Sequence, residues 1–157
     1  MSNIPLPKPD DLKNMLSMMY DDLSVDDGEP AEAGKYKCAV ALYLDDNDAP
    51  IAAAVADYPF AAYSGAALTM IPPGGAQDAV EEGDLGNSIL ENVNEVFNIC
   101  SRLLMNDSSP HLRLGPIYTS MDEVPEDQAA VVKGPNGRAD IAATIPNYGS
   151  GNISFMI

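Results

Sequence analysis

Basic residues are scarce in this sequence. Lys and Arg number 8 against 24 Asp and Glu, so the formal net charge is −16. Binding to nucleic-acid phosphates or to an anionic membrane surface depends on clustered Lys and Arg, and the charge balance argues against both kinds of partner. The chain is not an acidic disordered segment either, because 46% of its residues are hydrophobic and disordered segments are poor in such residues.

Cysteine and histidine are also rare. The two cysteines, Cys38 and Cys100, have no partner at CxxC spacing, and His111 is the only histidine. Metal and redox sites are usually built from clusters of these residues, so we expect no metal and no cofactor belonging to the chain itself. Both cysteines stand among apolar neighbours, which predicts that they pack as small hydrophobic residues.

Long apolar runs are missing. No run reaches the roughly 18 residues that indicate a membrane-spanning helix. The beginning of the sequence lacks the basic and then apolar pattern of a secretory signal. We therefore expect a cytoplasmic protein, with residues 1–9 as an extended, proline-rich lead-in and residues 10–157 as a single domain, since 157 residues suffice for one core.

Hydrophobic periodicity predicts an α+β fold in which a β-sheet is covered by long helices. The apolar pattern and the capping residues indicate helices at 9–23, 58–71, 84–105 and 125–133, with one or two further turns at 76–82. Strands are predicted at 35–44, 50–56, 112–120, 138–145 and 152–157, the first two as a hairpin, and loops at 24–34 and 72–75. The order of elements suggests two halves, each a helix, two strands and a helix.

The longest predicted helix carries an unusual polar stripe. At 100° per residue, six polar residues fall within about 100° of one another, opposite the apolar face: Asn87, Glu91, Asn94, Glu95, Asn98 and Arg102. An ordinary solvated face is one interpretation. However, such faces generally use Lys, Glu, Gln and Arg, whereas Asn is a poor residue inside a helix. The stripe is therefore a candidate functional surface.

Glu95 and Asn98 stand one helical turn apart, so both side chains can reach the same external target. A carboxylate can bind a cation on a partner. An amide can orient a water molecule through its oxygen while its NH2 group contacts an oxyanion. This combination supports hydrolysis by positioning rather than by covalent attack.

The run Asn94-Glu95-Val96-Phe97-Asn98-Ile99 resembles the Glu-x-x-Asn-Ile signature of the CheC/CheX/FliY family, bacterial phosphatases of phosphorylated chemotaxis response regulators. The resemblance implies a CheC-like fold over residues 10–157. It also implies that Asn98 orients the water that attacks the aspartyl phosphate of a CheY-like receiver domain, and that Glu95 contacts the receiver. The receiver would supply its own Mg²⁺.

The sequence departs from the family pattern in three respects. A small residue, often Gly, commonly follows a few positions after Asn-Ile in the family, whereas this sequence has Cys100-Ser101-Arg102. Glu91 occupies the position four residues before the Glu, where the family usually has Asp or Ser, and the helix at 9–23 lacks the second Glu-x-x-Asn pair that some members carry. Glu91 and Asn94 form an alternative register on the same helix, and Arg102 is a possible supporting residue. Three hypotheses follow: a phosphatase, a non-catalytic module that binds a receiver or forms a homodimer, and an interaction protein with an ordinary solvated helix.

Overall fold

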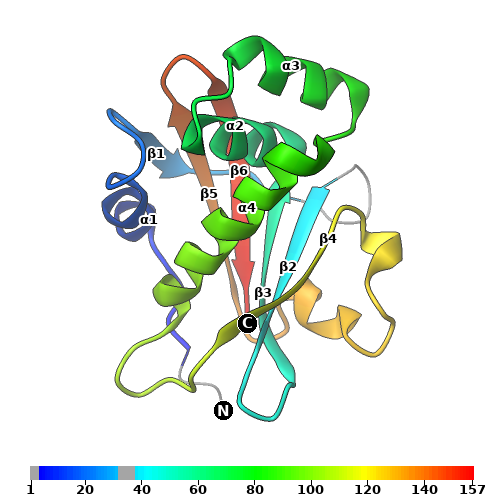
Figure 1. Cartoon of the computed structure of the whole chain (residues 1–157). Helices are drawn as coiled ribbons and strands as arrows, with labels where there is room; N and C mark the ends of the chain where they lie inside the picture. Colours follow the sequence, from blue (N-terminus) through cyan, green and yellow to red (C-terminus); the bar gives the residue numbers. More distant parts are fainter. Residues whose placement is uncertain (1–3, 32–37) are drawn as a thin grey trace.

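The structure is a computed structural model, and it describes residues 4–31 and 38–157. Within these residues the fold is α+β, as predicted, with one six-stranded antiparallel sheet in the order β1-β5-β6-β3-β2-β4 (Figure 1). The strands are β1 (Ser24–Asp27), β2 (Cys38–Leu44), β3 (Pro50–Asp57), β4 (Arg113–Tyr118), β5 (Arg138–Ile145) and β6 (Gly149–Met156). The helices are α1 (Pro9–Leu16), α2 (Tyr58–Leu68), α3 (Pro73–Glu82) and α4 (Gly86–Cys100), with 3₁₀ turns η1 (Ser101–Leu104), η2 (Met121–Glu123) and η3 (Ala129–Lys133).

Strands β2 and β3 pair with each other inside the sheet and are buried on both faces. Side chains on successive positions of a strand point to opposite faces, so β2 divides into two sets. Ala39, Ala41 and Tyr43 belong to the larger core cluster together with α1, α2 and α4, whereas Val40 and Leu42 pack in a smaller cluster with residues of η3. The sheet therefore has the long helices on one face and short irregular segments on the other (Figure 1).

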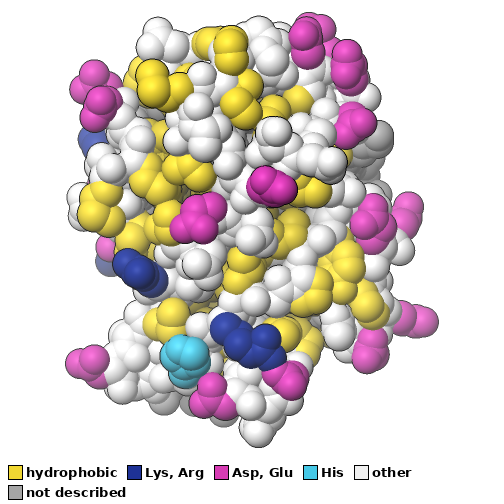
Figure 2. Space-filling model, in the orientation of Figure 1, with side chains coloured by type: hydrophobic (Ala, Val, Ile, Leu, Met, Phe, Trp, Pro, Cys, Tyr) yellow, Lys and Arg dark blue, Asp and Glu magenta, His cyan; other side chains and the backbone are white. Residues whose placement is uncertain are grey.

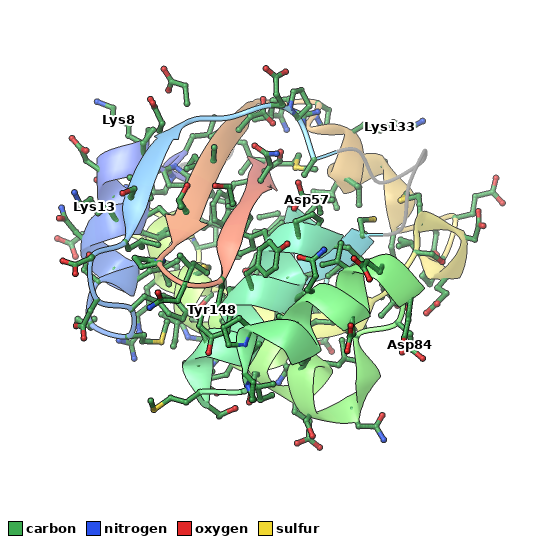
Figure 3. All side chains as sticks on the ribbon, turned by 90° about the horizontal axis from the view of Figure 1, so that it is seen from above. Lys8, Lys13, Asp57, Asp84, Lys133 and Tyr148 are labelled. Atoms are coloured by element: carbon green, nitrogen blue, oxygen red, sulfur yellow. The ribbon has the colours of Figure 1, made fainter. Side chains whose placement is uncertain are left out.

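Helix α2 lies very close to the sheet. A Cβ atom on Gly151 of β6 would stand 2.2 Å from the backbone nitrogen of Phe60, so only glycine fits this approach. The Asp57 carboxylate caps α2 by accepting a hydrogen bond from the Phe60 amide at 2.9 Å, as its position before Tyr58 predicts. The same carboxylate accepts the backbone N–H of Asn152 on β6 at 3.0 Å and is half-buried; Asp57 lies near the middle of the view from above (Figure 3).

Helix α4 crosses over α2 on the side away from the sheet (Figure 1). A Cβ atom on Gly65 of α2 would stand 2.9 Å from both the Cγ2 atom and the carbonyl oxygen of Ile89, so the two helices touch at this glycine. Asn92 of α4 adds a polar link, because its Nδ2 atom donates to the Gly65 carbonyl at 2.9 Å and to the Thr69 hydroxyl at 2.8 Å. These contacts fix α4 on the molecule.

The prediction of one helix over 9–23 is wrong beyond Leu16. The apolar spacing continues, but α1 ends at Leu16 and the chain turns, with Asp22 in the left-handed region at φ 56°. Tyr20 and Leu23 still reach the core, and the Tyr20 hydroxyl donates to the Ser64 carbonyl at 2.7 Å. Tertiary contacts, rather than continued helix, thus bring Tyr20 and Leu23 into the core.

Four other segments differ from the sequence prediction. Strand β1 lies within the predicted loop 24–34, where it pairs with β5 at the sheet edge and leaves its acidic side chains in water. The predicted break at 72–75 is mostly the first turn of α3, because Pro73 suits the beginning of a helix. The last strand begins at Gly149 rather than at residue 152, and the predicted helix at 125–133 is the 3₁₀ turn η3.

The remaining predictions agree well with the fold. The hairpin β2–β3, the helix α2 and the strand β5 are all confirmed, and the long helix is confirmed as α4 followed by η1. Cys38 and Cys100 are buried without a disulfide. The suggested pair of similar halves is visible in the strands only: hairpins β2–β3 and β5–β6 meet through β3 and β6 at the sheet centre. No helix in the described part of the chain has the length and apolar character needed to cross a membrane.

Candidate functional site

The polar stripe lies on the outer side of α4. Glu91, Asn94, Glu95 and Asn98 are all exposed there, and Arg102 is exposed on η1 directly after the helix. The opposite side of α4 is buried through Ile89, Val93, Val96, Phe97 and Cys100. In the space-filling view, acidic side chains are few over the middle of this face and gather toward its edges (Figure 2). The stripe therefore combines amides with two carboxylates and one guanidinium group on an acidic protein.

The end of α4 that carries Asn98 is held by two side-chain hydrogen bonds to its last carbonyl groups. The hydroxyl of Tyr43 on β2 donates to the Phe97 carbonyl at 2.7 Å, and the Ser101 hydroxyl donates to the Asn98 carbonyl at 2.6 Å. Carbonyl groups in the last turn of a helix lack some of their intrahelical hydrogen bonds, and these two hydroxyls supply partners for them. The backbone next to Asn98 is thus anchored to strand β2 of the sheet.

The side chains of the stripe are turned outward without internal partners. Within residues 4–31 and 38–157, the side chains of Glu95 and Asn98 form no hydrogen bond or ion pair, and the same is true of Glu91, Asn94 and Arg102. Glu95 and Asn98 are three positions apart on α4, which places them on neighbouring turns. The arrangement is a rigid helix that presents a carboxylate and an amide to an external molecule.

The alternative register has a different environment. Glu91 and Asn94 line a shallow hollow of about 370 Å³ between α4 and Ile117 of β4. Glu95 and Asn98 do not line this hollow and are exposed on α4 beside it. A target that inserts a side chain between α4 and β4 would meet Glu91 and Asn94, whereas a target that covers the ridge of α4 would meet Glu95 and Asn98.

Three residues near the beginning of α4 were not singled out by the sequence analysis. Asp84, Glu123 and the phenol of Tyr58 line a second hollow, which adjoins the first at Asn87 and Leu90. Burial raises the pKa of Tyr58 above its ordinary value of 10, and the nearby Asp84, Cys38 and Glu123 raise it further. These residues come from three distant segments, so no spacing in the sequence connects them.

A metal centre was not expected for the chain itself. Among the described residues, no group of three or more His, Cys, Asp or Glu side chains is arranged so that it could hold a metal ion. The acidic residues of the stripe, Glu91 and Glu95, number only two.

No protein-family model matches the sequence, and the comparison with curated proteins gives no match. The fold is similar to solved structures. The crystal structure of the FliM middle domain from H. pylori matches with a TM-score of 0.48 and 11% identity, over 94% of this chain and 83% of that one. The crystal structure of the CheX-CheY-BeF3-Mg²⁺ complex from Borrelia burgdorferi matches with a TM-score of 0.42 and 10% identity, over 92% and 91%.

A further match is the crystal structure of the chemotaxis protein CheX from Desulfovibrio desulfuricans, with a TM-score of 0.30, 14% identity and coverage of 92% and 91%. Each of these is a likeness in the arrangement of helices and strands.

Proposed function

We propose that this protein docks on a phosphorylated receiver domain and promotes hydrolysis of its aspartyl phosphate. The observation that carries the proposal is the placement of Glu95 and Asn98, exposed and one turn apart on a helix anchored to the sheet. Their sequence context, which resembles the Glu-x-x-Asn-Ile signature, supplies the identity of the target. Such a target would place the protein in the cytoplasm.

In the proposed reaction, the Asn98 side-chain oxygen accepts a hydrogen bond from a water molecule. This bond orients the water so that a lone pair of the water oxygen points toward phosphorus. The water oxygen forms the new P–O bond, the bond to the receiver's aspartate oxygen breaks, and that carboxylate leaves with the bonding electron pair. Both protons of the water end on the inorganic phosphate, one on the attacking oxygen and one transferred to another phosphate oxygen. Hydrolysis of this kind needs mainly positioning and charge stabilisation, which one amide and the receiver's own Mg²⁺ can provide.

Glu95 has a different role in this proposal. Its carboxylate is exposed and without an internal partner, so it is available to a cation on the receiver surface. Contact at Glu95 would fix the distance between Asn98 and the phosphoryl group, since both side chains stand on the same rigid helix. Glu95 is therefore assigned to docking and Asn98 to the water.

A second candidate is a module of the same fold that binds the receiver without catalysis. Two observations favour it. Glu91 stands where the family usually has a shorter residue, and no described residue holds the amide of Asn98 in a fixed orientation. A side chain without such support is less well prepared for catalysis than one that is held in place.

The decisive experiment follows phosphate release from a CheY-type receiver phosphorylated by acetyl phosphate in the presence of Mg²⁺. We expect the wild-type protein to accelerate release. The Asn98→Ala variant should release phosphate about 100-fold more slowly than the wild type, a typical loss for one positioning group. The Asn94→Ala variant should keep the wild-type rate. If phosphate is released equally fast with and without the wild-type protein, catalysis is excluded. If the protein still binds the receiver in that case, it is the non-catalytic binding module.

A further inference from the structure

The two hollows beside α4 form one continuous groove, which we call the α4–β4 groove. They share Asn87 and Leu90, and the hollow near the beginning of the helix has a volume of about 560 Å³. Helix α4 lines the groove with Asn87, Leu90, Glu91 and Asn94, which follow the three-and-four spacing of one helix face. These four positions span roughly 10 Å of helix at 1.5 Å per residue.

The base of the groove is apolar. Leu90 and Ile117 are half-buried and face the hollow from α4 and β4. Tyr58, at the beginning of α2, is 8% exposed and lines the other end. An apolar side chain of a partner would lose contact with water against these residues, which favours association in proportion to the apolar area covered.

The rim of the groove is acidic. Glu82, Asp84, Glu91 and Glu123 line it, and neither hollow contains a Lys, Arg or His residue. Two of these carboxylates are held in place, because Asp84 accepts the Gly86 amide at 3.0 Å and Glu123 accepts the Thr119 hydroxyl at 3.0 Å. Within the described residues none of the four forms an ion pair, so their charges are available to a partner.

None of the basic side chains in the described part of the chain lines the groove. Figure 3 shows Asp84 at one side of the molecule and the labelled Lys8, Lys13 and Lys133 on the other sides. The raised pKa of the Tyr58 phenol also reflects the negative charge of Asp84 and Glu123, after the larger effect of burial. The groove thus combines an apolar base with a negative potential that nothing in the described part of the chain neutralises.

We propose that the α4–β4 groove is the docking site for a basic, partly apolar segment of the receiver domain. The proposal rests on the proposed function, because the groove continues from Asn94 along the same helix that carries Asn98. Lys or Arg side chains of the receiver meet the acidic rim, and an apolar side chain between them packs on Leu90 and Ile117. The groove then contributes to affinity and orientation, while Asn98 contributes to the chemical step.

The test separates docking from chemistry. The variant Glu82→Gln/Asp84→Asn/Glu123→Gln removes three charges from the rim, and its amides preserve the shape and the accepting oxygen at Asp84 and Glu123. We expect about a tenfold rise in KM for the phosphorylated receiver and an unchanged kcat. The affinity should also depend less on salt, because charges at a rim act mainly through screened, long-range attraction.

The matched control is Asp21→Asn/Asp22→Asn/Asp27→Asn, which removes the same number of exposed charges near β1, at the opposite edge of the sheet from β4. It should leave KM within about twofold of the wild type. If both triple variants have the same KM, the groove proposal is overturned while the phosphatase function stands.

If the wild-type protein binds the receiver without hydrolysing its phosphate, the two triple variants are compared by their Kd for the receiver instead of KM. The rim variant is then expected to raise Kd about tenfold. A wild-type protein that neither binds nor hydrolyses overturns the proposed function and the groove proposal together. Thermal unfolding followed by circular dichroism checks that both triple variants are folded.

Discussion

The phenol of Tyr43 donates a 2.7 Å hydrogen bond to the carbonyl of Phe97, the residue directly before Asn98. Tyr43 is fully buried on β2, and burial raises its pKa well above 10, so the hydroxyl keeps its proton. This bond joins strand β2 of the sheet to the turn of α4 that presents the candidate catalytic amide. The sheet therefore determines where Asn98 stands.

Replacing Tyr43 by Phe should lower both stability and activity. The substitution leaves the Phe97 carbonyl without the phenol, which should cost about 1 kcal/mol of unfolding free energy. Because the last turn of α4 can then shift, kcat for receiver dephosphorylation should fall several-fold. Urea unfolding followed by circular dichroism measures the first effect, since the sequence contains no Trp, and phosphate release measures the second.

Tyr148→Phe is the matched control for this prediction. The Tyr148 hydroxyl donates to the Ile71 carbonyl at 2.6 Å, in the connection between α2 and α3. The same chemical change should lower the unfolding free energy by a similar amount. It should leave kcat unchanged, because the Ile71 carbonyl lies outside α4. Equal losses of kcat in both variants would contradict the positioning role of Tyr43.

Gly65 sets the distance between α2 and α4. Alanine would normally stabilise a helix interior by about 1 kcal/mol relative to glycine. At Gly65, however, the new Cβ atom would meet the Ile89 carbonyl at 2.9 Å and push α4 outward. We expect Gly65→Ala to destabilise the protein by about 1–3 kcal/mol. Gly74→Ala in α3 meets no atom within 4 Å, so it should be neutral or slightly stabilising in the same urea titration.

The long helix could be predicted from the sequence because its signal is local. Ile89, Val93, Val96 and Cys100 recur at the helical period and all are buried, so the polar residues between them had to face outward. The exposure of Glu95 and Asn98 follows from this pattern. The pattern does not indicate which of the two registers meets a partner, because that depends on the shape of the partner.

Other features depend on contacts between distant segments. Strand β1 contains Asp26 and Asp27, which disfavour strands, and it exists because β5 offers a partner. The α4–β4 groove brings Asp84 beside Glu123, nearly forty positions away, only because β4 lies next to α4. No local pattern contains this information, so the groove could be found only in the fold.

Cys100 gives a prediction for alkaline pH. Burial raises the pKa of its thiol from 9.0 to about 12. Above pH 9 the unfolded chain loses this proton while the folded chain keeps it, so the unfolded state binds fewer protons and the unfolding free energy falls as pH rises toward 12. One thiol contributes a slope of up to about 1.4 kcal/mol per pH unit. In the Cys100→Ala variant, the unfolding free energy should fall less steeply between pH 9 and 11 than in the wild type, and the two slopes should agree between pH 6 and 8. Identical slopes for variant and wild type over both ranges would show that the Cys100 thiol does not cause the alkaline loss of stability.

Met70 occupies a position that favours glycine. It follows the end of α2 with φ 59°, and the bonds from Ile71 N to the Ala66 carbonyl and from Met70 N to the Ala67 carbonyl form the Schellman motif. A left-handed conformation costs a side-chain-bearing residue roughly 1–2 kcal/mol, and at 85% exposure the Met70 side chain recovers little by packing. Met70→Gly should therefore raise the unfolding free energy by about 0.5–1 kcal/mol, after the entropy that glycine adds to the unfolded chain. Met70→Ala keeps the strain and should not stabilise the protein, so an equal gain in both variants would show that the left-handed backbone is not the cause.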